Sequence, residues 1–153
     1  MIDNRYEVRI ELEAQKFKFF SEGPKGKIEK MVCYSKTHRA NIYNLGFGDY
    51  NESIDDFDDR VVTNNGDSQK VLATVASSLF TFTDRYPDAA IIASGSTLAR
   101  TRLYRMGITN NLLLIEKDFH VFGYLGREFV RFEKNVHYEG FLVKRKKINK
   151  FNI

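Results

Sequence analysis

The sequence predicts an α+β fold: a single domain in which one long and one shorter helix pack against a mainly antiparallel, bent β-sheet. Three observations favour this class. Several short stretches alternate apolar and polar residues, as half-buried strands do, while one stretch repeats its apolar residues every three or four positions, as an amphipathic helix does. Aromatic residues are abundant, with 13 Phe, 8 Tyr and no Trp, and such rings suit a β-rich core better than a helical bundle.

The first part of the chain is predicted to hold strands joined by tight turns. The alternation predicts strands at residues 6–12, 17–20, 27–34 and 41–47. The segment Glu22-Gly23-Pro24-Lys25-Gly26 supplies the backbone angles of a turn, so the second and third strands should form a hairpin. A further short strand is expected at residues 60–63, before the turn at residues 64–66.

The second part changes its periodicity. Apolar residues recur at helical spacing from Asp67 to Tyr86, with Asp67 or Ser68 as the cap and Pro87 just past the end. Residues 89–93 are wholly apolar, which is typical of a central strand. A second helix should run to about Met106 and end at Gly107. The remaining segments are residues 111–116, as helix or strand, and a closing meander at residues 119–124, 128–133 and 138–144.

Length and composition indicate one globular domain, which we place at residues 1–143, followed by a basic tail at residues 144–153. The net charge is +4, with 42% hydrophobic and 29% charged residues. The single cysteine, Cys33, cannot form an internal disulfide, and the first residues are polar where a secretory signal would be apolar. Both observations favour a cytoplasmic protein. No apolar run approaches the roughly 20 residues of a membrane helix, so we expect no membrane partner.

The main candidate site is the turn Gly95-Ser96-Thr97 between the apolar strand and the arginine-rich helix. A helix start offers free N–H groups to an anion, and arginine can bind the anion with two hydrogen bonds. We therefore expect anion contacts from four residues, namely Ser96, Thr97, Arg100 and Arg102. A helical wheel places Arg102 beside an apolar stripe, where a buried charge needs a partner. That partner is either an internal carboxylate or a ligand anion, and Ser96 and Thr97 could equally serve only as helix caps.

The start of the long helix is a second candidate. It contributes Asn65 and Lys70 as secondary anion contacts. If both helix starts open at the same end of the sheet, Asn65 and Lys70 share a cleft with the four residues above. The alternative is an ordinary turn followed by a cap.

Other charged segments give weaker predictions. The acidic run at residues 52–59 is expected to be a solvated loop, which could face a basic partner or pair with the basic tail. His38, His120 and His137 lack the spacing of metal ligands, so we expect no metal, and no motif indicates a cofactor.

Four stretches taken together carry a family resemblance: residues 19–28, residues 42–49, residues 64–75 with the phrases NNGD and VLATV, and residues 95–104 with GST and RTRLY. From about Tyr6 to Val143, the chain resembles a family of small bacterial proteins of unknown function. The resemblance implies a bacterial, cytoplasmic, single-domain protein, and it brings no activity, cofactor or catalytic residue.

Three functions stay open at this point. The one we favour is an anion-binding module that contacts the phosphate of a nucleotide or nucleic acid through the turn at residues 95–97. The second is a small nucleotide-using transferase or a toxin-like effector of a phage-defence or toxin–antitoxin system, so the sequence does not decide whether the chain is an enzyme. The third is a protein-interaction domain, which includes a homo-oligomer.

Overall fold

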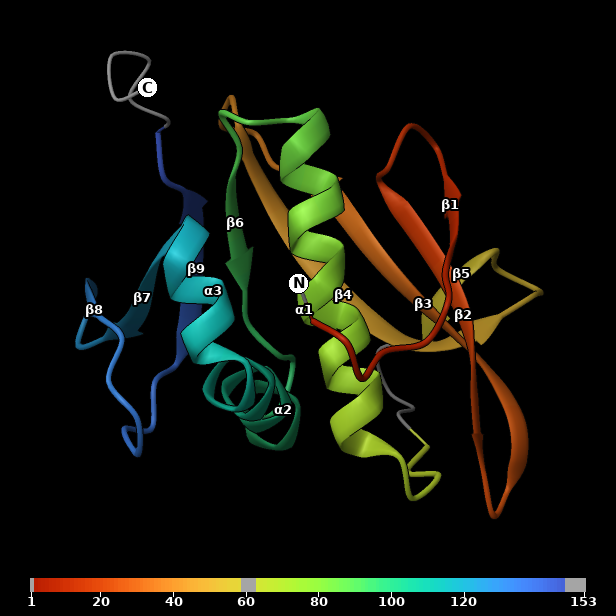
Figure 1. Ribbon diagram of the computed structural model, residues 1–153. Coiled ribbons are helices and arrows are strands. Elements are labelled where there is room, and N and C mark those ends of the chain that lie inside the picture. Colours follow the sequence, from red (N-terminus) through yellow and green to blue (C-terminus); the bar gives the residue numbers. More distant parts are fainter. Residues whose placement is uncertain (1, 59–62, 148–153) are drawn as a thin grey trace.

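The computed structural model describes residues 2–58 and 63–147, and it has the predicted α+β architecture (Figure 1). Within these residues, nine strands form one open sheet in the order β1-β2-β3-β4-β6-β9-β7-β8, with β5 paired to β4. Only β4 and β6 are parallel neighbours among the pairs of this part of the chain. The elements are β1 (Arg9–Glu11), β2 (Lys16–Gly23), β3 (Gly26–Lys36), β4 (Ile42–Asn51), β5 (Asp56–Asp58), α1 (Ser68–Arg85), β6 (Ala90–Ala93), α2 (Leu98–Asn110), α3 (Leu112–Asp118), β7 (Phe119–Leu125), β8 (Glu128–Arg131) and β9 (Gly140–Arg145).

The core lies between α1 and one face of the sheet. Phe82 of α1 is fully buried; its ring stacks on Tyr34 of β3, with centroids 4.1 Å apart, and meets Tyr43 of β4 edge-on at 5.0 Å. Because strand side chains alternate between faces, every second residue of β2, β3 and β4 joins this core. Figure 1 shows α1 crossing the middle strands, with α2 and α3 beside it. No helix of the described ranges is long and apolar enough to cross a membrane.

Most strand predictions are confirmed, with shifted ends. The expected first strand is much shorter, because residues 12–14 turn away with positive φ angles. β6 is central, between β4 and β9, as its apolar sequence predicted. The closing strands do not form a meander: β7 lies between β8 and β9, and β9 returns to pair with β6. The strand predicted at residues 60–63 falls largely outside the described residues.

The end of the chain is also more structured than predicted. Lys144 and Arg145, which we assigned to the basic tail, belong to β9. Arg145 pairs with Asp84 at 2.9 Å and donates to the Thr83 hydroxyl at 2.7 Å. The rest of the predicted tail lies outside the described residues from residue 148 on.

The helix ends correct two predictions. Asp67 is the N-cap residue of α1 but makes no side-chain cap, because its carboxylate accepts hydrogen bonds from Tyr6, at 2.6 Å, and from Ser21. Gly107 does not end α2, which continues to Asn110. The glycine lies inside the helix and faces Leu72 of α1. Residues 112–118 form α3, so of the two alternatives given for residues 111–116, helix or strand, the helix is correct.

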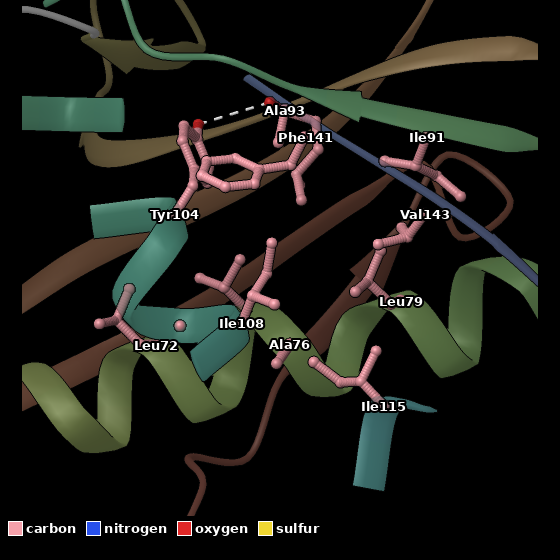
Figure 2. A pocket seen from close by; sticks show the side chains of 13 residues that line it. Leu72, Ala76, Leu79, Ile91, Ala93, Tyr104, Ile108, Ile115, Phe141 and Val143 are labelled. Carbon is pink, nitrogen blue, oxygen red and sulfur yellow. Dashed lines mark hydrogen bonds between the residues drawn. The ribbon is translucent and has the colours of Figure 1, made fainter. Parts of the chain in front are cut away.

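A small apolar cavity remains where α1, α2, α3 and the sheet meet (Figure 2). Its volume is about 40 Å³ and its lining is almost entirely hydrocarbon. The Tyr104 hydroxyl beside it donates to the carbonyl of Leu45 at 3.4 Å, as the dashed line in Figure 2 shows. Such a void is too small for an organic ligand and offers water no polar partners, so it is a packing gap rather than a binding site.

Replacing Gly107 by alanine should stabilise the protein. Gly107 lines the cavity, and a Cβ there would lie 3.5 Å from Leu72, an ordinary contact. Alanine also gains about 1 kcal/mol over glycine inside a helix. We expect Gly107→Ala to raise the free energy of unfolding by about 0.5–1 kcal/mol, measured by urea denaturation. A loss of stability would show that the helices cannot accommodate the extra methyl group.

Candidate functional site

The site is built on an edge of β4 that its neighbouring strands leave open. On this edge β6 pairs with β4 only as far as Asn44, and β5 pairs with it from Asp49 onwards. Between these points, α2 supplies the missing donors: Tyr104 donates to the carbonyl of Leu45, and Arg100 donates through Nη2 to the carbonyl of Phe47. Side chains of a helix thus satisfy carbonyl groups that a continuing strand would have paired.

Arg100 is the most unusual charge in this region. Only 8% of the residue is exposed, and its guanidinium lies 5.9 Å from the centroid of the Phe47 ring. Among the described residues it forms no ion pair, and its Nη1 has no hydrogen-bond partner. A guanidinium carries five N–H donors and a full charge, and removing both from water is costly unless they are paired. The site therefore holds a buried cation that lacks a counter-charge within the described chain.

A hollow of about 320 Å³ opens beside this cation at the start of α2. We call it the Arg100 hollow. The start of the helix and the open edge of β4 form one side, and β5 forms another. Its lining residues are Ser35, Asn44, Leu45, Gly46, Phe57, Ser94, Gly95, Ser96, Arg100 and Tyr104.

The turn before α2 is held tightly by its own hydrogen bonds. Thr97 is the N-cap, and its hydroxyl accepts from the N–H of Arg100 at 3.2 Å. The N–H of Gly95 donates to the Thr101 hydroxyl at 3.1 Å. The N–H groups of Leu98 and Ala99, the first two residues of α2, have no acceptor in the described part of the chain, as expected for the first turn of a helix. The turn is held by these hydrogen bonds and still offers donors.

Gly95 is required for this arrangement. A Cβ at this position would lie 2.5 Å from the Cβ of Arg100 and 2.5 Å from the backbone nitrogen of Thr101. Those atoms belong to the rigid start of the helix, so they cannot move away independently. Glycine therefore sets how closely the turn and Arg100 approach each other.

Tyr104 completes the polar wall of the hollow. Burial raises the pKa of its phenol above the ordinary value of 10.0, while the positive charge of Arg100 acts in the opposite direction. The phenol is therefore neutral at physiological pH, so it adds no negative charge beside the guanidinium and leaves the positive charge of the site uncompensated.

The structure reverses the expected roles of the two arginines. Arg102 is exposed, whereas Arg100 is buried. The helical wheel was wrong about Ala99 and Arg102, which are exposed, whereas Leu103 and Met106 are partly buried and pack against the core as predicted. The buried side of α2 instead holds residues that pack closely or bond to the sheet, namely Arg100, Thr101, Tyr104, Gly107 and Ile108. Ser96 lines the hollow, and Thr97 acts as a cap.

Asn65 and Lys70, the two secondary anion contacts predicted from the sequence, do not line the Arg100 hollow. Asn65 is almost fully buried and fixes the β2–β3 turn: its amide donates to the carbonyl of Gly26 at 2.8 Å and accepts from the N–H of Lys25 at 2.7 Å. The ammonium of Lys70 lies 4.3 Å from the ring centroid of Tyr6. A separate hollow of about 210 Å³ lies at the start of α1 and shares no lining residue with the Arg100 hollow. The predicted common cleft is not formed.

Sequence reasoning missed a buried ion pair beside this second hollow. Lys30 of β3 is 1% exposed, and its ammonium pairs with Asp49, directly opposite on β4. The same ammonium donates to the carbonyl of Thr63 at 2.9 Å, and Asp49 accepts from the Thr63 hydroxyl. The only signal in the sequence is a lysine at a core-facing position of an alternating strand. Its partner depends on the register of the two strands, which the sequence does not fix.

The acidic run was predicted as a solvated loop, but its residues Asp56–Asp58 form β5, which pairs with β4. The loop before β5 makes local contacts. Asp55 accepts a hydrogen bond from the Tyr50 phenol at 2.7 Å, and Lys18 of β2 lies 3.8 Å away. The hydrogen bond from Tyr50 is the main cause that lowers the pKa of Asp55. Within residues 2–58 and 63–147, no cluster of three or more His, Cys, Asp and Glu side chains could hold a metal ion.

The fold and site define a small α+β protein with one open sheet and a cationic hollow at a helix start. Over residues 3–146 the chain matches the model of DUF6934, a family of unknown function, and it belongs to that family. This confirms the resemblance to an uncharacterised family. Comparison with curated proteins and with solved structures gives no match.

Proposed function

We propose that the protein is an anion-binding module of the bacterial cytoplasm that holds the phosphate of a nucleotide or nucleic acid in the Arg100 hollow. The observation that supports it is the buried Arg100, whose Nη1 and whose charge both lack a partner in the part of the chain that the structure describes. A phosphate beside Gly95 would supply that charge. The single cysteine and the family resemblance support the cytoplasmic setting.

The start of α2 suits a phosphate in three ways. The N–H groups of Leu98 and Ala99 have no acceptor within residues 2–58 and 63–147, and the helix dipole adds partial positive charge at this end. The Ser96 hydroxyl lines the hollow. The guanidinium of Arg100 can form charge-assisted hydrogen bonds, which are about twice as strong as neutral ones.

The alternative is that Arg100 only supports the fold by binding the carbonyl of Phe47. A neutral donor would satisfy one carbonyl without the cost of burying a charge. The alternative also leaves the charge of Arg100 without a counter-ion among the described residues. The two interpretations make different predictions for a neutral variant of Arg100.

Isothermal titration calorimetry with phosphate, pyrophosphate and ATP at low salt tests the proposal. Hydrogen bonds to charged groups contribute about 1.5–3 kcal/mol, so we expect Arg100→Gln to weaken binding at least about tenfold. Arg102→Gln is the matched control from the same helix, because Arg102 is exposed, and it should bind almost as the wild type does. Affinity should also fall with added salt.

Circular dichroism establishes that each variant is folded. The proposal is wrong if the wild-type protein binds none of the three anions. It is equally wrong if a folded Arg100→Gln variant binds them with unchanged affinity, in which case the structural role of Arg100 is its only role.

A further inference from the structure

We propose that the ligand is a single nucleotide unit, with its phosphate at Arg100 and its base against the ring of Phe57. This inference rests on the proposed function and names the class of ligand that the same hollow takes. The hollow has two chemically different ends, one cationic and one aromatic, both among its lining residues.

Phe57 provides the aromatic end. Its ring packs directly on Gly46 of β4, where a Cβ would lie 2.5 Å from the ring atom Cζ. Among the described residues, the ring of Phe57 pairs with no other aromatic ring, although most aromatic residues of the core pair with a neighbour in stacked, tilted or edge-on contact. Phe57 is half-buried in the wall of the hollow, so a planar base can stack against it.

Polar groups lie beside the ring. Ser35 and Asn44 are directly paired neighbours on β3 and β4, and both line the hollow. The Asn44 side chain is exposed and carries both a donor and an acceptor, the combination that the edge of a base requires. Asn44 and Gly46 are two strand residues apart, or about 7 Å, so the amide and the ring lie within the span of one nucleotide.

Charge fixes the direction of the ligand. The residues that line the hollow around Phe57 carry no charge, so nothing at that end attracts a phosphate. The other end has the Arg100 guanidinium and the start of α2. The volume of about 320 Å³ is at the lower limit of small-molecule pockets, which are roughly 300–1,000 Å³. A single nucleotide suits this space, whereas a duplex does not.

The test compares phosphate, ribose 5-phosphate and the four nucleoside 5′-monophosphates by calorimetry. Stacking on an aromatic side chain strengthens binding by roughly tenfold or more per base, so the best nucleotide should bind at least about tenfold more tightly than ribose 5-phosphate. Phe57→Leu should remove this difference and leave the affinity for ribose 5-phosphate unchanged, and Phe57→Tyr should preserve it. A 5′-phosphorylated dinucleotide is added to distinguish two possible ligands, a free nucleotide and the 5′ end of a nucleic-acid strand. The proposal is supported if either the mononucleotide or the dinucleotide binds more tightly than ribose 5-phosphate.

If all nucleotides bind no better than ribose 5-phosphate, the base has no site at Phe57 and this inference is overturned, while the proposed function stands. If no phosphate compound binds, the proposed function itself fails. Should Phe57→Leu not fold, proton NMR of the wild-type protein replaces it. Addition of the best nucleotide should shift the Phe57 ring protons, and unshifted ring protons at saturation would overturn the inference.

Discussion

Asp49→Ala is expected to destabilise the protein by about 3–5 kcal/mol, because it leaves the ammonium of Lys30 buried without its carboxylate. Lys30 is 1% exposed, and its remaining described partner is the carbonyl of Thr63. Small domains have a total stability of about 5–15 kcal/mol, so this single change removes a large share of it. Urea denaturation followed by circular dichroism measures the loss.

Two controls separate the ion pair from a general effect of substitution. Replacing both partners, as Lys30→Met with Asp49→Leu, should recover most of the lost stability, because apolar side chains need no counter-charge. Asp88→Ala removes an exposed carboxylate from the loop before β6 and should change stability by less than about 1 kcal/mol. A loss below 1 kcal/mol for Asp49→Ala would contradict the burial of this pair.

The second large effect is expected from Gly95→Ala, which should remove the anion site and also destabilise the fold. The added Cβ would lie 2.5 Å from the Cβ of Arg100 and the backbone nitrogen of Thr101, so the start of α2 must shift. Inserting a methyl group into such a packed contact costs about 1–3 kcal/mol. The displaced N–H groups and guanidinium should bind phosphate at least about tenfold more weakly.

Gly107→Ala is the matched control, since it makes the same substitution inside α2 at a position that has room for a methyl group. It should stabilise the protein and keep phosphate binding. Equal thermal stability and equal affinity in the two alanine variants would show that the close approach at Gly95 has no consequence.

Much of the fold could be predicted from local patterns. Strict alternation located the strands around the Gly23–Gly26 turn, and the helical spacing of Val71, Leu72, Val75 and Leu79 located α1. These signals are strong because each segment buries one regular face. The pairing of β9 with both β6 and β7 could not be predicted, since it depends on contacts between distant segments.

The candidate site was predicted less well. The turn at residues 95–97 and Arg100 were found, because a glycine-containing turn before a helix has a recognisable chemistry. The roles of Arg100 and Arg102 were interchanged, since α2 buries an arginine and small residues where apolar side chains were expected. Phe57 and the open edge of β4 gave no sequence signal. They form part of the site only because β6 and β5 pair with the two ends of β4 and leave its middle unpaired, which depends on tertiary contacts.

The most direct test of the account is an NMR titration of the ¹⁵N-labelled protein with phosphate. The account predicts saturable shifts of the Leu98 and Ala99 amides and of the guanidinium nitrogens of Arg100, while the signals of Asn65 and Lys70 stay unchanged. In Arg100→Gln the amide shifts should require at least about tenfold more phosphate. Shifts that are absent at Leu98 and Ala99, or that are centred on the start of α1, would contradict an anion site in the Arg100 hollow.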